Sequence, residues 1–267
     1  HCFKPYPCDF IGHCWKKTDK DSVYSLTGIP FETRARLAAA GYLTIQDIPA
    51  GLLEENDAAI LSSHLTGKDI LDSSGIRQVI DGKGTPVFAA FLIVRPAVPV
   101  VDGFRPFGPM IVGFSWNDFQ GNEGSFIAEP GESPVYQIRK MLGQLASDGS
   151  TIAYSGGKWV NNALRQHYQD MTEKFIFTDI EEIFLSGNFY RPGLIPDAGI
   201  NQIAAFLHLT SADQTMISQT MAGVKYMEVR EENREHTLKE LGTALSAEVA
   251  SCRSVYHFLK NIINNET

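Results

Sequence analysis

Three of the four cysteines of this chain fall close together, at Cys2, Cys8 and Cys14. Thiolates grouped in this way are typical of a metal site, because a soft, closed site needs several sulfur ligands. With His1 or His13 as a further ligand, the group would suit zinc. The alternative is three free structural thiols. We expect a metal-site origin, because chance would scatter cysteines along the chain.

Glu248 is an acidic residue whose position calls for a partner. It lies three residues after Leu245 and four before Cys252, on or beside an apolar stripe that predicts a long helix over about 231–262. Burial of an unpaired charge is costly, so a glutamate on this face needs a partner or a ligand. A salt bridge to an internal arginine and a bound metal are the two alternatives.

Asp179 lies in the segment Phe177-Thr-Asp-Ile-Glu-Glu182, directly before apolar residues. It suits a metal-ligating carboxylate, and equally a helix N-cap or first-turn acid. Upstream, Ser155-Gly156-Gly157 precedes a predicted helix. Its backbone N–H groups would suit an anion, although an ordinary strand-to-helix turn explains the glycines as well.

The element that must position these acids is the apolar run Val87–Val94, bounded by Pro86 and Pro96. Its composition predicts a strand buried on both faces at the centre of an α/β sheet. Before it, helical patterns at 31–40, 55–65 and 68–80 end in a glycine-rich turn at 81–84. After it, strands and helices alternate, which predicts a three-layer architecture with a mixed central sheet. The expected strands lie at 109–118, 124–128 and 151–154, the segment through Asp179 at 175–184, and the expected helices at 134–145, 158–168, 198–207, 213–226 and 231–262.

Bulk properties are those of an ordinary globular protein, with 43% hydrophobic and 20% charged residues. The net charge of −8 argues mildly against a surface built for phosphate backbones, although a local basic groove can coexist with it. No run reaches the roughly 18 apolar residues of a membrane span, and no signal peptide is evident. We expect a cytoplasmic location from the uneven cysteine usage. Because the chain begins with His1 rather than Met, we expect a fragment of a longer protein.

The spacing of Val98-Pro99, Asp102-Gly103, Arg105-Pro106-Phe107 and Phe114-Ser115 after the central strand supports a more specific prediction. This stretch resembles a bacterial family of unassigned function with an RNase H-like, DEDD exonuclease-type fold. The resemblance implies two divalent metals held by carboxylates from separate elements. It also implies three parts of the chain: a cysteine-rich tail at 1–30, a small helical segment at 31–84 and an RNase H-like domain at 85–267.

Two of the family's carboxylates are missing. Ala90 and Leu92 stand where the family has an acid-x-acid pair on the first strand. Asp179 matches the middle acid, and Glu248 occupies the place of the last aspartate. Loss of ligands that bridge two metals removes most of the charge stabilisation that such a site supplies. The resemblance therefore implies a degenerate domain that is catalytically inactive, with Asp179 and Glu248 as residual acids and a doubtful Mg²⁺ or Mn²⁺ site.

The cysteine head resembles the end of RecB-like nuclease domains, where three cysteines join a distant fourth around an iron–sulfur cluster. This implies an iron–sulfur cluster at Cys2, Cys8 and Cys14, with zinc as the competitor, and an upstream RecB-like nuclease domain as the partner.

Three functions follow from the sequence and the resemblance. The first is an inactive module that binds DNA or RNA or supports an adjoining nuclease, with phosphate contacts from Lys158, Arg165, Arg105 and Lys225. The second is an active 3′–5′ exonuclease in which Glu181, Glu182, Asp102 or Asp118 replaces the missing acids. The third is a structural or protein-interaction domain.

Overall fold

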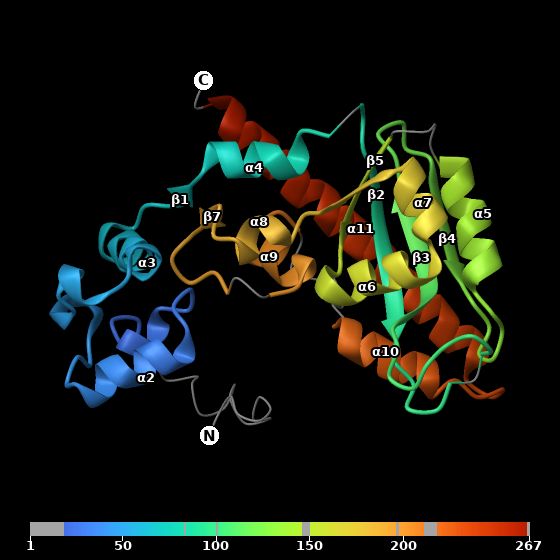
Figure 1. Ribbon diagram of the computed structural model, residues 1–267, viewed down its shortest axis with the longest axis horizontal. Coiled ribbons are helices and arrows are strands. Elements are labelled where there is room, and N and C mark those ends of the chain that lie inside the picture. Colours follow the sequence, from blue (N-terminus) through green and yellow to red (C-terminus); the bar gives the residue numbers. More distant parts are fainter. Residues whose placement is uncertain are drawn as a thin grey trace. The chain divides into compact units, whose positions relative to one another are not determined.

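The central strand β2 (Val87–Val94) is buried along its whole length, as its apolar run predicts. It is the middle member of a five-stranded sheet of order β4-β3-β2-β5-β6 (Figure 1). Strands β3 (Met110–Asn117) and β4 (Glu123–Ile127) continue from it in antiparallel pairing. On its other side, β5 (Thr151–Ser155) and β6 (Ile176–Asp179) run parallel to it. The sheet is therefore mixed.

The computed structural model describes residues 19–82, 84–99, 101–145, 150–195, 198–210 and 218–265. The chain forms two compact units: residues 1–72 with 184–197, and residues 73–183 with 198–267. The domain boundaries that the sequence predicts, at residues 30 and 84, stay a prediction. Among the described residues, no helix has both the length and the apolarity that crossing a membrane requires.

One face of the sheet in the second unit is covered by helices α5 (Val135–Leu145), α6 (Gly157–His167) and α7 (Gln169–Lys174). Side chains alternate along β2, so Phe91 and its neighbours two residues away point to this face. They form a buried core with apolar side chains of the three helices. This side of the sheet is thus a closed hydrophobic layer.

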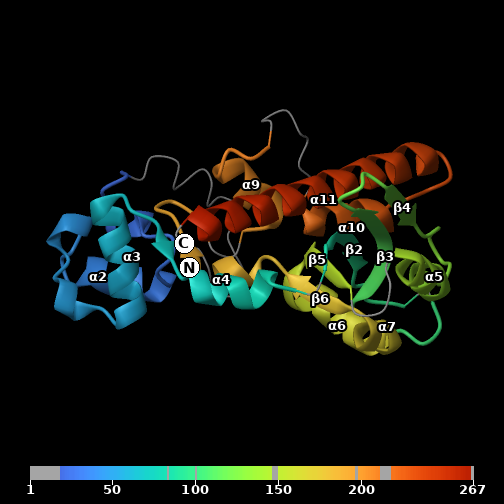
Figure 2. The same cartoon turned by 90° about the horizontal axis from the view of Figure 1, so that it is seen from above.

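The opposite face is covered by α10 (Gln219–Met227) and α11 (Arg234–Asn265), and α9 (Ile200–Phe206) packs against α11 (Figure 2). The alternate residues of β2, which include Ala90 and Leu92, point to this side. The layers confirm the predicted α/β fold class with a mixed central sheet.

Gly113 allows α11 to approach the sheet. A Cβ atom at this position would lie 2.9 Å from Cβ of Leu92 and 3.1 Å from Cδ1 of Leu245 on α11. Contacts this short require neighbouring atoms to move. The absence of a side chain at Gly113 therefore sets how closely the long helix packs on β2 and β3.

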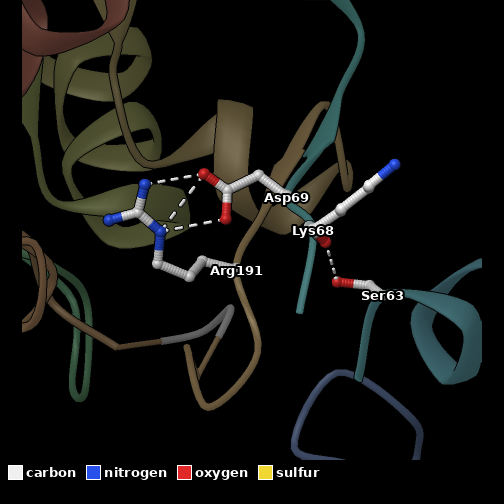
Figure 3. A network of polar contacts seen from close by, with 4 residues as sticks. All are labelled: Ser63, Lys68, Asp69 and Arg191. Carbon is white, nitrogen blue, oxygen red and sulfur yellow. Dashed lines mark hydrogen bonds and ion pairs between the residues drawn. The ribbon is translucent and has the colours of Figure 1, made fainter. Parts of the chain in front are cut away.

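The first unit holds α2 (Phe31–Ala39), α3 (Glu55–Thr66) and short 3-10 turns around a small core of apolar side chains. Two two-residue strands, β1 (Ile70–Leu71) and β7 (Phe189–Tyr190), pair in antiparallel register in this unit. Next to β7, Arg191 binds Asp69 through two nitrogens, with Nη2 2.6 Å from Oδ2 (Figure 3). This ion pair ties the returning segment to the chain before β1.

The predicted helix at 68–80 is wrong in its first half. Residues 70–71 form β1, and helix α4 (Ser73–Ile80) begins only after it. Pairing with β7 replaces the expected first helical turn. Because this partner lies more than a hundred residues away, the local sequence carries no signal of the strand. Helix α7, strand β7 and the short helix α8 (Glu182–Leu185) had no prediction. Helix α10 covers the later part of the predicted helix at 213–226, whose residues 213–217 lie outside the described chain.

We predict that Gly113→Ala lowers the free energy of unfolding by about 1–3 kcal/mol, because the new methyl group overpacks the contact between β2 and α11. Urea denaturation measures the change. Gly143→Ala is the matched control, since Gly143 is an exposed residue of α5 with nothing near its added Cβ. That control should be neutral or stabilising by up to about 1 kcal/mol. Equal stability of wild type and Gly113→Ala would contradict the close approach.

Candidate functional site

Ala90 lies at the centre of the sheet between two serines. It is opposite Ser115 of β3 and Ser155 of β5, and it is fully buried. The three residues form a row across adjacent strands on the side of α11. Where the resemblance implies a carboxylate, this row offers a methyl group.

Leu92, two residues further along β2, shares this face. It lines a small cavity together with Leu241, Leu245 and Glu248 of α11. Its side chain therefore supplies apolar packing where the resemblance implies the second acid of the first strand.

Glu248 is buried, with 8% of its surface exposed. The hydroxyl of Ser155 donates a hydrogen bond of 2.8 Å to its Oε1. The long helix predicted from the apolar stripe thus places Glu248 over the carboxyl end of β5. The bond compensates part of the cost of removing this carboxylate from water.

Asp179 ends strand β6, opposite Tyr154 of β5. Its Oδ1 accepts the backbone N–H of Glu181 at 3.1 Å, and the N–H of Gly157 also donates to its carboxylate. Burial, followed by the neighbouring charge of Glu181, raises the pKa of Asp179 to about 7. The residue therefore holds the turn after β6 and is also an acid that is partly protonated at neutral pH.

Glu181 joins the two predicted acids. Its Oε1 accepts the N–H of Ile200, at the start of α9, at 2.9 Å, and the N–H of Gly156 donates to its carboxylate. Burial and then the charge of Glu248 raise the pKa of Glu181 to about 7. The sequence named Glu181 only as a substitute acid, because it lies in an irregular turn where no periodicity assigns a direction to its side chain.

Asp179, Glu181 and Glu248 are called the acid cluster below. The N–H groups of Gly156 and Gly157, which the sequence offered to an external anion, donate to carboxylates of this cluster instead. Gly156 and Gly157 have φ values of 142° and 54°, a region that favours glycine. The strand-to-helix turn is therefore shaped around the protein's own anions.

Cys252 lies one helical turn after Glu248 and is fully buried, with its Sγ 3.7 Å from the carbonyl oxygen of Ala153. Burial and then the charges of the acid cluster raise the pKa of its thiol. A neutral thiol is a poor metal ligand and a poor nucleophile. Cys252 belongs to the packing under α11.

The residues present differ from the carboxylate set that the resemblance implies for two metals. Among the described residues, no group of three or more His, Cys, Asp or Glu side chains is arranged to hold a metal ion. Each acid of the cluster already accepts a hydrogen bond from the protein. The first strand contributes only Ala90 and Leu92. The predicted thiolate ligands Cys2, Cys8 and Cys14 lie outside the described residues, so the cluster at the cysteine head stays a prediction.

The other substitute acids lie elsewhere. Glu182 is exposed at the start of α8, and Asp102 is exposed in the loop after β2. Asp118 is half-buried in the turn between β3 and β4, where hydrogen bonds from Asn122 and Gln120 reach its carboxylate. These bonds lower its pKa. Of the substitutes, only Glu181 joins the acid cluster.

The predicted phosphate contacts differ in their surroundings. Lys158 and Arg165 are exposed on α6, and Arg105 is exposed in the loop between β2 and β3. Lys225 on α10 forms an ion pair with Glu240 of α11. The first three are therefore more accessible to a phosphate than Lys225.

Sequence reasoning missed an aromatic residue next to these cations. The guanidinium of Arg95 lies 3.6 Å from the ring centroid of Trp159, and Nζ of Lys158 lies 5.1 Å from it. Nε of Arg95 also donates to the carbonyl of Phe107, whose side chain is 61% exposed. The sequence Lys158-Trp159 at the start of a predicted helix could have indicated this cation–aromatic surface.

No protein-family model matches the sequence, and no curated protein matches it. Among solved structures, the chain is similar to the family B DNA polymerase from the hyperthermophilic archaeon Pyrobaculum calidifontis. The match has a TM-score of 0.41 and 12% identity, and it covers 65% of this chain and 24% of the polymerase chain. These comparisons assign no family.

We predict that the acid cluster makes stability depend on pH. Because the folded-state pKa values of Asp179 and Glu181 lie near 7, above their ordinary values of 3.8 and 4.5, the folded state holds more protons than the unfolded state between pH 4 and 7. The free energy of unfolding should therefore fall as pH rises through this window, by roughly 2–4 kcal/mol. Urea denaturation at several pH values measures it.

Asp179→Asn and Glu181→Gln keep a hydrogen-bond acceptor and remove the titration. Each should flatten the fall in stability and leave the protein more stable than wild type at pH 8. Glu173→Gln, at an exposed position of α7, is the matched control and should follow wild type. Parallel pH profiles for all four proteins would show that the cluster is not protonated near neutral pH.

Proposed function

We propose that the second unit is an exonuclease-like domain that binds nucleic acid and does not cleave it. The observation that carries this proposal is the chemistry around β2. Ala90 and Leu92 lie where metal-bridging acids are expected, and Asp179, Glu181 and Glu248 accept hydrogen bonds from the protein.

Two-metal hydrolysis needs carboxylate oxygens that are directed at the metals from separate elements. In this domain, the N–H groups of Gly157 and Ile200 and the hydroxyl of Ser155 each donate to a different acid of the cluster. A metal would have to compete with these donors for the carboxylate oxygens, and any donor that it displaced would be left unpaired, which costs free energy. The arrangement therefore favours an acid cluster that is closed by hydrogen bonds from the protein.

The nucleic-acid surface that we propose is centred on Trp159. Arg95 and Lys158 place positive charge against this ring. Phe107, whose carbonyl accepts a hydrogen bond from Arg95, exposes a second ring in the loop between β2 and β3. Aromatic rings beside cations are the usual means of holding single-stranded nucleic acid without reading its sequence, because bases stack on rings and phosphates bind cations. Arg165 and Arg105 would extend the positive surface. Lys225 would contribute less because of its ion pair with Glu240.

We also propose that this domain adjoins a RecB-like nuclease segment that ends in Cys2, Cys8 and Cys14. Those cysteines would hold an iron–sulfur cluster, or zinc, with a ligand from upstream. The role of the domain would then be to hold DNA or RNA for the adjoining nuclease, in the reducing cytoplasm that such cysteine usage favours.

We predict that Lys158→Gln and Arg165→Gln each weaken binding of single-stranded DNA severalfold, because each removes a phosphate contact. Trp159→Ala should weaken it by about 1–3 kcal/mol, because a stacking ring is lost. Binding should also fall steeply with salt, since bound phosphates release counterions. Fluorescence anisotropy with a labelled oligonucleotide at several salt concentrations measures these changes.

Arg36→Gln is the control, since it removes one exposed charge from α2 in the first unit. It should leave the affinity within twofold of wild type. An affinity that does not respond to salt, or an absence of binding at low salt, would refute the binding function. The domain would then be structural or serve protein interaction.

The convergence of Glu181 with Asp179 and Glu248 favours one second candidate, an active nuclease with a rearranged acid set. In that case, manganese should stimulate release of mononucleotides from single-stranded DNA, and Asp179→Asn should abolish it. Our proposal predicts no release above a metal-free control. Thin-layer analysis of an end-labelled oligonucleotide distinguishes the two, and metal-dependent release that Asp179→Asn removes would establish the active nuclease.

A further inference from the structure

A cavity lies on the α11 side of the sheet, between this helix, the inner strand β3 and the edge strand β4. Its volume is about 420 Å³, which lies within the range of small-molecule sites. The walls that face one another are Ser115 and Asn117 of β3, Glu123 and Ser125 of β4, and Arg253 of α11. These residues are separate from the acid cluster, which gathers around Ser155 of β5.

Arg253 supplies the positive charge of the cavity. Its Nη1 donates to Oδ1 of Asn117 at 2.8 Å, and its guanidinium lies 5.7 Å from the ring centroid of Phe119. These contacts fix the guanidinium at the wall, where it is half-buried. Within the described chain, no carboxylate lies within ion-pair distance of Arg253. The guanidinium of Arg253 is therefore fixed in position, and its charge is available to an anion that enters the cavity.

Serine hydroxyls line the same cavity as this cation. The Oγ of Ser115 lies 3.4 Å from the Oγ of Ser246 on α11 and donates a hydrogen bond of 3.3 Å to the carbonyl oxygen of Gly124. Ser125 and Ser254 line the same cavity from β4 and α11. Hydroxyl groups can donate hydrogen bonds to phosphate oxygens and can accept them from sugar hydroxyls. A guanidinium with several hydroxyls is a donor set that suits a phosphate group.

Glu123 adds an acceptor of opposite charge to the cavity lining, on the edge strand β4. A carboxylate repels a phosphate but accepts hydrogen bonds from sugar hydroxyls. The two charges therefore favour a ligand whose phosphate lies at Arg253 and whose hydroxylated part reaches Glu123.

We propose that this cavity binds a small phosphomonoester of a hydroxylated sugar, either a free sugar phosphate or a mononucleotide. This site goes beyond the nucleic-acid surface at Trp159 and does not depend on it, because the two share no residue.

Isothermal titration calorimetry of the full chain with ribose 5-phosphate and uridine 5′-monophosphate tests the proposal, with ribose and inorganic phosphate as partial probes. We expect saturable binding of at least one sugar phosphate with a Kd below about 1 mM, and weaker binding of both partial probes. Affinity for ribose 5-phosphate equal to that for the mononucleotide would identify the sugar phosphate as the recognised part. Tighter binding of the mononucleotide would add the base.

Arg253→Gln should weaken the binding at least tenfold. Ser125→Leu is the second variant: it lies on the exposed edge strand, keeps Arg253, and places an apolar side chain in the cavity, so it should weaken binding as strongly. Arg139→Gln, at an exposed arginine of α5, should bind as wild type does. Thermal melting by circular dichroism confirms that each variant is folded.

Two results would overturn the proposal. One is the absence of a saturable heat signal when either sugar phosphate is added up to about 10 mM, a concentration well above the expected Kd. The other is equal affinity in wild type and in folded Ser125→Leu. Neither result bears on single-stranded DNA binding, which is measured separately at Trp159 and Lys158.

Discussion

The hydrogen bond from the Ser155 hydroxyl to Glu248 is the interaction on which the centre of this domain depends. It joins the carboxyl end of β5 to the buried face of α11 and satisfies a carboxylate that is only 8% exposed. A buried charge without such a donor would be costly, so the donor and the helix register constrain each other. Gly113 permits the close packing that brings the helix down to this bond.

The remaining acids follow from the same constraint. Glu248 is buried beside the ends of β5 and β6. The side chains of Glu181 and Asp179 therefore lie near other carboxylates in a site that water reaches poorly. Their pKa values rise, and backbone N–H groups of the turns after β5 and β6 and of Ile200 in α9 donate to them. In a working two-metal site, the metal ions relieve the repulsion between neighbouring carboxylates. Here, partial protonation and hydrogen bonds from the protein relieve it instead. Ala90 and Leu92 fit this scheme, because an acid on β2 would add another charge to the same buried face.

The central strand, the long helix and the mixed sheet could be predicted, because an apolar run of eight residues and a stripe along α11 are strong periodic signals. The two-residue strands β1 and β7 could not be predicted, since their pairing depends on partners far apart in sequence. At the site, the sequence named Asp179 and Glu248, but it could not place Glu181 with them, because the side-chain direction of this turn residue comes from tertiary contacts. It could not place Trp159 of α6 against Arg95 either, because the two residues lie far apart in the sequence. The cavity at Arg253 was missed because its serines come from three elements and form no motif.

The central claim is that Asp179, Glu181 and Glu248 are held by hydrogen bonds from the protein and bind no pair of metal ions between β2, β6 and α11. The most direct test is a crystal of the protein soaked in manganese and measured at a wavelength where manganese scatters anomalously. Our account predicts no anomalous peak among Ala90, Leu92, Asp179, Glu181 and Glu248, with Ser155 still bound to Glu248. Two manganese ions coordinated by Asp179 and Glu248 would contradict it.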